Sequence, residues 1–433
     1  MVLPVLGIYA PQYPGSTAFL VGLALGVYGI SQCILQIPFG LISDRIGRKP
    51  VIIFGMLLFL AGSLVAAYAE TLTGIIIGRA LQGSGAVAST VMAMLSDLTR
   101  EEIRVRAMAT IGASIGVSFA VAMIVGPWIA SLWGLQVLFV VTAGLALVGI
   151  AIVIWVVPSP AVQRVVSSRE TLAVPKLLVS TAKHPELLRI NLGIFCLHLV
   201  QMACWVSVPL LLQQRFDFGI ENHWWFYLVT MGSGFLIMVP FIIIAEKFQR
   251  MKQVFLGGIA TLVMGEALLR LSGESFPLFV AGLVIFFVAF NLLEACLPSL
   301  VSKTAPGGTR GTAMGIYSSS QFLGAFMGGS LGGWVAYQFG YSSVFVLSLV
   351  FGVLWLLVAW SMNTPKNWSS LVLELLPGEQ LDENRLLSEV PGLVDVVLLP
   401  EQKLAYLKLD KQLFDIANLE TLLGRPLADQ PSR

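Results

Sequence analysis

Between two long apolar segments stands the charged stretch Gly40-Leu41-Ile42-Ser43-Asp44-Arg45-Ile46-Gly47-Arg48-Lys49. The flanking segments, residues 18–40 and 51–69, each match the roughly 20 apolar residues with which a helix crosses the bilayer hydrocarbon. Membrane proteins retain Lys and Arg in their cytoplasmic turns, and this stretch carries Arg45, Arg48 and Lys49. The sequence here predicts two membrane-spanning helices joined by a cytoplasmic turn.

The composition of the whole chain also indicates a membrane protein. Of 433 residues, 57% are hydrophobic and only 12% are charged, with a mean hydropathy of +0.85. Soluble domains carry about 25% charged residues, so the composition excludes a water-soluble globule. The net charge is only +2, and no nucleic-acid partner is expected.

Neither a cofactor nor an enzymatic activity is expected from the motifs. The cysteines lie inside apolar segments, without the spacing of a metal site or a disulfide framework: Cys33, Cys196, Cys204 and Cys296. No stretch fits the phosphate-binding pattern G-x-x-x-x-G-K-[ST]. We therefore expect no metal, no cofactor and no ATP chemistry.

Apolar runs long enough to cross a membrane recur along the chain. There are eleven: residues 18–40, 51–69, 73–95, 107–132, 137–157, 190–212, 225–245, 255–271, 278–301, 312–338 and 343–362. A twelfth run, residues 1–10, is too short and ends at a turn-rich segment. We expect an all-α membrane protein whose first helix lacks its N-terminal half and whose intact form has twelve spans.

Lys and Arg gather on one side of these spans. Sixteen lie in alternate loops: Arg45, Arg48, Lys49, Arg100, Arg104, Arg106, Arg164, Arg169, Lys176, Lys183, Arg189, Lys247, Arg250, Lys252, Lys303 and Arg310. The opposite loops hold only Arg215 and Arg270. The basic side is predicted to be cytoplasmic, together with the C-terminal residues.

The two halves of the apolar region are similar to each other. Residues 37–45 match residues 239–247, and residues 104–134 match residues 310–340. A parallel repeat of this kind predicts two six-helix bundles related by an axis along the membrane normal. We expect four parts: a first bundle at 1–158 with an incomplete first helix, a linker at 159–189, a second bundle at 190–365 and a cytoplasmic domain at 366–433.

Two motifs carry a resemblance to a known family. Residues 40–49 fit the pattern G-x-x-x-D-R-x-G-R-K of the major facilitator superfamily at every position. The fourth span carries its R-x-x-Q-G-x-G pattern, as Arg79-Ala80-Leu81-Gln82-Gly83-Ser84-Gly85. The chain resembles this family over nearly its whole length. The resemblance implies the two-bundle fold of a secondary transporter in the cell inner membrane, working by alternating access.

The charged stretch has two interpretations. A basic turn that only fixes the topology does not need Asp44. A carboxylate there can accept hydrogen bonds from the free N–H groups at a helix start. The best candidate start is that of the eleventh span, and the family resemblance implies the same contact. Gly40 would let two helices approach closely, and Arg48 is expected to pair with Asp97. We predict a latch that holds the cytoplasmic side closed, formed by Gly40, Asp44, Arg45, Gly47, Arg48, Lys49, Asp97, Gly311 and Thr312.

Ionisable residues inside the spans are candidates for proton coupling. Glu294 lies near the middle of the tenth span, and a carboxylate inside a membrane can carry protons. His198 in the seventh span is its expected partner, and a packing role is the alternative. In this superfamily, both spans line the cavity. Glu266 is a rival acid, for which a structural pair with Arg270 is expected.

Arg79 lies within the fourth span, where a central Arg costs about 2.5–3.5 kcal/mol on insertion scales. It either bonds backbone carbonyls or acts beside a titrating group or a substrate. Neutral polar side chains inside the spans are cavity candidates, or bond one helix to another: Gln32, Gln36, Gln82, Asn191, Gln201 and Asn291.

The fifth span carries Gly126-Pro127, which resembles part of the G-x-x-x-G-P-x-x-G-G element of drug–proton antiporters. Ala122 replaces the first glycine of that element, and Ala130-Ser131 replace its final pair. We expect Gly126 and Pro127 to act as a hinge or packing position, and the partial match weakens the antiporter interpretation without removing it.

Beyond residue 365, charged residues return. Period-two alternation predicts strands at 369–375, 394–399 and 404–409, and helices are expected at 381–389 and 415–423. The order βαββα suggests a small ferredoxin-like α+β domain. It resembles heavy-metal-associated domains in outline but holds no cysteine, so metal chaperoning is not expected. A regulatory or self-associating module is expected, with a stabilising cap as the alternative.

These observations favour a transporter whose partners are a small-molecule substrate, protons and membrane lipid. Proton influx that drives efflux of an amphiphilic compound is the preferred interpretation. The alternatives are nutrient uptake by proton symport, and a transporter-like sensor that signals through its C-terminal domain.

Overall fold

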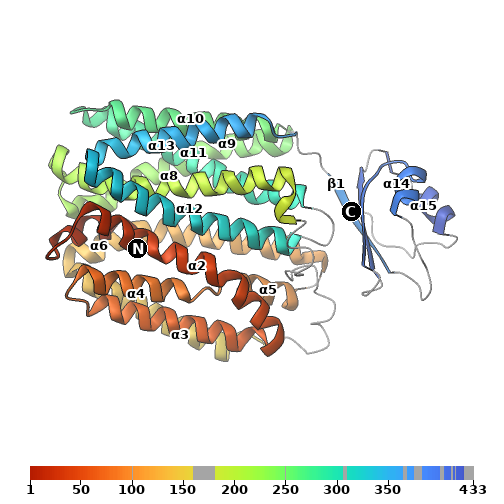
Figure 1. Ribbon diagram of the computed structural model, residues 1–433, viewed down its shortest axis with the longest axis horizontal. Coiled ribbons are helices and arrows are strands. Elements are labelled where there is room, and N and C mark those ends of the chain that lie inside the picture. Colours follow the sequence, from red (N-terminus) through yellow and green to blue (C-terminus); the bar gives the residue numbers. More distant parts are fainter. Residues whose placement is uncertain are drawn as a thin grey trace.

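The computed structural model (Figure 1) describes residues 1–99, 101–158, 181–248, 250–305, 310–363, 368–374, 383–399, 404–410, 413–414 and 416–423. The first part of the chain forms α1 (Leu3–Tyr9), η1 (Ala10–Gln12), α2 (Ala18–Ile46), α3 (Arg48–Ala67), α4 (Leu72–Ser84), α5 (Ala88–Leu98) and α6 (Glu101–Trp155). The second part forms α8 (Pro185–Phe216), η4 (Ile220–Asn222), α9 (His223–Lys247), α10 (Met251–Leu271), α11 (Phe276–Thr304), α12 (Arg310–Phe339), η5 (Tyr341–Ser343) and α13 (Val344–Trp360).

Each of the eleven predicted spans falls on helical residues, with two differences from the sequence prediction. The predicted span 73–95 is divided into α4 and α5, because the chain leaves the helix after Ser84. At Gly85 a β-carbon would lie only 2.3 Å from the carbonyl oxygen of Gly55. The predicted spans 107–132 and 137–157 are continuous in α6, which is interrupted only at Gly134 with φ 78°. Among the described residues, eight helices are long and apolar enough to cross a membrane.

Helix α12 lies between α2 and α8 (Figure 1) and contacts both through glycines. Toward α2, a β-carbon on Gly329 would lie 2.6 Å from the carbonyl oxygen of Gly22. Toward α8, a β-carbon on Gly328 would lie 2.1 Å from the carbonyl oxygen of Leu199. Both distances are below van der Waals contact, so neither position accepts a side chain. Since α2 and α8 belong to different parts of the chain, α12 joins the two halves backbone to backbone.

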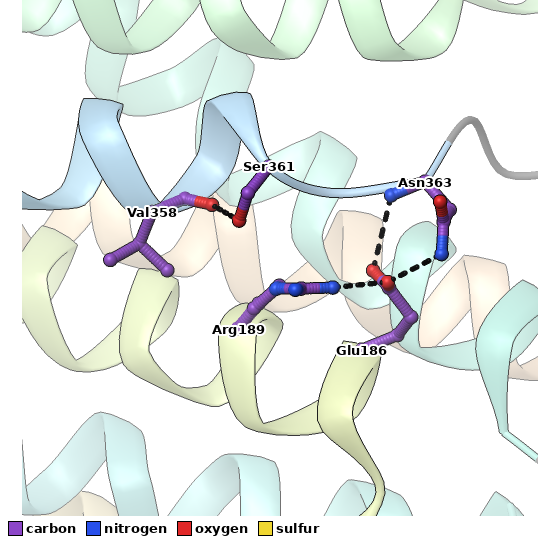
Figure 2. A network of polar contacts seen from close by, with 5 residues as sticks. All are labelled: Glu186, Arg189, Val358, Ser361 and Asn363. Carbon is purple, nitrogen blue, oxygen red and sulfur yellow. Dashed lines mark hydrogen bonds and ion pairs between the residues drawn. The ribbon is translucent and has the colours of Figure 1, made fainter.

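Polar contacts join α8 to the residues that follow α13 (Figure 2). Glu186, in the first turn of α8, bonds the side chain of Arg189. Its Oε1 also accepts from Asn363 Nδ2 at 2.9 Å, and its Oε2 accepts from the Asn363 backbone N–H at 3.4 Å. Ser361 closes the end of α13 by donating to the Val358 carbonyl at 2.8 Å. The chain is therefore held against α8 where it leaves the helical array.

The C-terminal elements follow in the predicted order: β1 (Trp368–Glu374), α14 (Glu383–Glu389), β2 (Leu393–Leu399), β3 (Leu404–Asp410) and α15 (Ile416–Leu423). The strands form one antiparallel sheet in the order β1-β3-β2. Leu386 of α14 and Leu419 of α15 are buried together with Leu407 of the central strand. Figure 1 places this unit beyond the end of the helical array at which α2 and α13 end.

We predict that Gly329→Ala destabilises the protein because its methyl group overlaps the α2 backbone. Overpacking of this kind costs about 1–3 kcal/mol, and thermal unfolding in detergent measures it as a lower melting temperature. Gly315→Ala is the matched control on the same helix, since a β-carbon there meets nothing within 4 Å. Equal melting temperatures for the two variants would contradict the packing described for α12.

Candidate functional site

Arg48, at the start of α3 directly after the turn from α2, forms a buried ion pair with Asp97 of α5. Arg48 Nε lies 3.0 Å from Asp97 Oδ2, and their side chains are only 4% and 0% exposed. Arg48 Nη1 also donates to Ser43 Oγ at 2.6 Å, and Ser43 Oγ donates to the Gly40 carbonyl at 2.7 Å. The structure therefore brings together Arg48 and Asp97, as expected from the sequence, and adds Ser43, which the sequence analysis missed.

The other expected latch residues have varied surroundings. Gly47 joins the two helices with φ 97°, a conformation that side chains rarely adopt. Arg45 is exposed, Lys49 is partly buried and Thr312 is buried. The side chain of Asp44, and the surroundings of Gly311, lie outside the described part of the structure. A β-carbon on Gly40 would make only an ordinary contact, 3.5 Å from Ser89 Oγ. Among the described residues, the nearest neighbour of this position is therefore on α5, and the close helix approach expected at Gly40 stays a prediction.

Arg79 of α4 is buried within a polar cluster of the first half. Its Nη1 donates to Gln82 Oε1 at 2.9 Å, and its Nε donates to the Ala24 carbonyl at 3.4 Å. The guanidinium carbon lies 4.9 Å from the ring centroid of Tyr28, an arrangement in which the ring face attracts the cation. In the described part of the chain, no carboxylate lies within ion-pair distance of Arg79. Arg79 therefore bonds a backbone carbonyl and a network of neutral side chains, and among the described residues it bonds no carboxylate.

Glu294 of α11 and His198 of α8 face each other in the second half. Glu294 Oε2 lies 3.9 Å from His198 Nε2. Gln321 of α12 connects them: its Nε2 lies 2.8 Å from His198 Nε2 and 3.3 Å from Glu294 Oε1. The Glu294 side chain remains 36% exposed and that of His198 12% exposed, so water-sized molecules reach part of this cluster.

The sequence analysis did not single out Gln321. A usable signal was present in Tyr317-Ser318-Ser319-Ser320-Gln321, an unusually polar run for a membrane span. Tyr317 and Gln321 are four residues apart and share one helix face. Glu294 and His198 were identified because they are ionisable, whereas the neutral amide of Gln321 has no ionisable group that would single it out.

Glu266 does not form the expected pair with Arg270. Its carboxylate is buried and accepts from Cys204 Sγ at 3.0 Å, linking α10 to α8. Arg270 is exposed. The Glu266 side chain therefore bonds across to α8 rather than along α10.

The neutral candidates are all buried, and they divide between the two halves. Gln82 Nε2 donates to Ser63 Oγ at 2.8 Å, so it bonds α4 to α3. Gln32 Nε2 donates to Tyr28 Oη at 3.0 Å within α2. The others are buried, and among the described residues their side chains bond to neither cluster: Gln36, Asn191, Gln201 and Asn291.

Gly126 and Pro127 lie within α6, where the helix continues past the proline. A β-carbon on Gly126 would lie 2.4 Å from the carbonyl oxygen of Met1. The pair thus packs against the start of the chain. The backbone of α6 departs from helical geometry at Gly134 instead.

Comparison with known proteins agrees with the helix order and the motifs. The family model described as "Major Facilitator Superfamily" matches residues 1–329 and 225–377. The chain belongs to the major facilitator superfamily and is a multi-pass membrane transporter.

Several relatives share most of the chain. It is 46% identical over 423 residues to the inner membrane transport protein YajR of Escherichia coli strain K12, covering 97% of this chain and 92% of the relative. It is 25% identical to the multidrug resistance protein MdtH of Aeromonas salmonicida, covering 76% and 81%. The crystal structure of the human organic anion transporter MFSD10 (TETRAN) has a TM-score of 0.57 at 18% identity, covering 78% and 84%. That last likeness shows the fold alone.

We predict that Arg48→Gln destabilises the protein strongly, because it leaves the Asp97 carboxylate buried without its charge partner. Breaking a buried pair on one side costs about 3–5 kcal/mol. A double-mutant cycle with Asp97→Asn, measured by thermal unfolding, should give clear non-additivity. The exposed pair Arg385–Glu389 is the control, with a coupling of about 0.5 kcal/mol or less. Additive effects at Arg48 and Asp97 would contradict a coupled pair.

Proposed function

We propose that the protein is a proton-coupled efflux transporter for a small amphiphilic compound, and that residues 1–158 and 190–365 alternate around a central site. The cluster of Glu294, His198 and Gln321 carries this proposal. A carboxylate and an imidazole 3.9 Å apart can exchange a proton. No Lys or Arg lies within ion-pair distance of Glu294 in the described residues, so no fixed cation competes with the proton.

The relatives support efflux over the alternatives. MdtH is named as a multidrug resistance protein, and the partial antiporter element at Gly126-Pro127 agrees with it. A membrane potential of 100 mV supplies about 2.3 kcal/mol for each charge moved inward. That free energy is sufficient to maintain a useful substrate gradient without ATP.

The charged turn between α2 and α3 is proposed as the cytoplasmic latch. The buried pair of Arg48 and Asp97 fixes the start of α3 against α5, and Arg48 also bonds Ser43 near the end of α2, which would place Asp44 at a constant position. Helix α12 begins at Arg310, so Gly311 and Thr312 belong to the first turn that Asp44 would contact. Asp44→Asn should then reduce the outward-open population.

We predict that Glu294→Gln abolishes the coupling between proton movement and substrate movement. Flux is measured in proteoliposomes carrying a pH gradient, with a panel of amphiphilic compounds. Substrate-dependent proton exit from the wild type identifies antiport, and proton co-entry identifies symport. Binding without flux identifies a sensor.

Glu266→Gln is the matched control, since Glu266 is a buried acid in the same half outside the cluster. Loss of coupling in Glu266→Gln but not in Glu294→Gln would contradict the assignment of Glu294.

For the C-terminal unit we propose a ferredoxin-like fold on the cytoplasmic side, with a regulatory or self-associating role. Its support is the element order and the antiparallel sheet β1-β3-β2.

We predict that deleting residues 368–433 leaves the transport helices folded but alters transport regulation or self-association. Size-exclusion chromatography with light scattering measures the oligomeric state, and the flux assay measures the rate. If neither changes while the melting temperature falls, the unit is a stabilising cap.

A further inference from the structure

The amide of Gln321 is bonded to both members of the cluster through one nitrogen. Its Nε2 lies 2.8 Å from His198 Nε2 and 3.3 Å from Glu294 Oε1. An amide nitrogen carries two hydrogens and has no acceptor capacity. Both contacts are therefore hydrogen bonds only when His198 Nε2 carries a lone pair and Glu294 Oε1 carries no proton.

A proton on either contact atom changes this arrangement. The protonated atom becomes a donor and faces the donating amide nitrogen. The hydrogen bond is restored if the terminal amide of Gln321 turns over and presents Oε1, which can accept from both sides. This torsion is broad and roughly two-fold, so the turn requires no change of the rest of the side chain. The present amide orientation therefore matches the state in which neither contact atom carries a proton, and the turned orientation makes both hydrogen bonds only when both atoms carry one.

We propose that Gln321 is a positioning residue whose amide orientation follows the proton occupancy of Glu294 and His198. The inference rests on the proposed function, because it assumes that the cluster binds the coupling proton. It adds the residue that links the two proton-binding groups to α12.

The backbone next to Gln321 has no free space on either side. A β-carbon on Gly29 of α2 would lie 2.5 Å from the carbonyl oxygen of Phe322. The ring of Phe322 meets that of Tyr28 edge-on, with centroids 6.4 Å apart. On the other face, a β-carbon on Gly324 would lie 2.2 Å from the carbonyl oxygen of Phe195 in α8. Gln321 therefore lies on a segment of α12 that is closely packed against both α2 and α8, so the response to a proton is confined to its side-chain amide.

The other titratable groups near this segment stand apart from the amide. Tyr317 is buried one turn earlier on α12. Tyr28 and Arg79 lie beyond Phe322, on α2 and α4. In the described part of the chain, the Gln321 side chain bonds His198 and Glu294 alone.

Infrared difference spectroscopy of the full chain in lipid nanodiscs tests the proposal directly. Glutamine is labelled with ¹³C at its side-chain carbonyl, and the pH is varied across the titration of the carboxyl band. We expect one glutamine carbonyl band to shift together with the carboxyl band and to vanish in Gln321→Met. Gln338→Met is the control, on the exposed end of the same helix, and should retain the band. A carboxyl band that titrates without any glutamine shift overturns the proposal.

The pH profile of transport gives a second readout. Gln321 donates to the ionised form of Glu294, so its loss disfavours that form and the proton is held to higher pH. A charge-assisted hydrogen bond corresponds to a shift of about one pH unit, and the Gln321→Met midpoint should rise by about that amount. An unchanged midpoint overturns the role of Gln321 alone. A wild type with no proton coupling, or a carboxyl titration that persists in Glu294→Gln, overturns the proposed function instead.

Discussion

The structure depends on one packing constraint, which is that α12 contacts two other helices without space for side chains. Inside a bilayer there is little hydrophobic driving force between helices, so close packing and internal hydrogen bonds hold them together. Glycines supply that closeness on both faces of α12, at Gly329 toward α2 and at Gly328 toward α8. Because α2 and α8 come from different halves, the relative position of the halves is set along this one helix.

The polar groups are arranged around the same helix. The cluster of Arg79, Gln82 and Tyr28 lies on the side of α2, and the cluster of Glu294, His198 and Gln321 lies on the side of α8. The hydrogen bonds of each cluster lie within its own half, and the rings of Tyr28 and Phe322 meet between the two clusters. A change in one cluster can therefore influence the other through packing, without a charge crossing the interface.

Much of the fold could be predicted from the sequence, because apolar length and Lys/Arg asymmetry report directly on the bilayer. The limits of prediction appear at Gly85 and Gly134. Both break or bend the backbone for reasons set by neighbouring helices or a turn, and a hydropathy pattern does not register them. In the site, Arg48 and Asp97 were predictable because a buried charge requires a partner. Gln321 was not predictable, because its role depends on two groups from other helices that lie within hydrogen-bond distance of it. Glu266 was not predictable either, because it bonds Cys204 on another helix and not Arg270 on its own helix.

The hydrogen bonds between Glu186 and Asn363 also limit how far the C-terminal unit can lie from the helical array. Strand β1 begins at Trp368, and five peptide steps from Asn363 extend at most about 17 Å. Because Asn363 is bonded to α8, this short connection keeps the sheet near the membrane surface and sets its local concentration there. Any molecule bound to this unit would therefore be held close to the helical array, at a local concentration set by the length of this connection and not by the concentration in bulk solution.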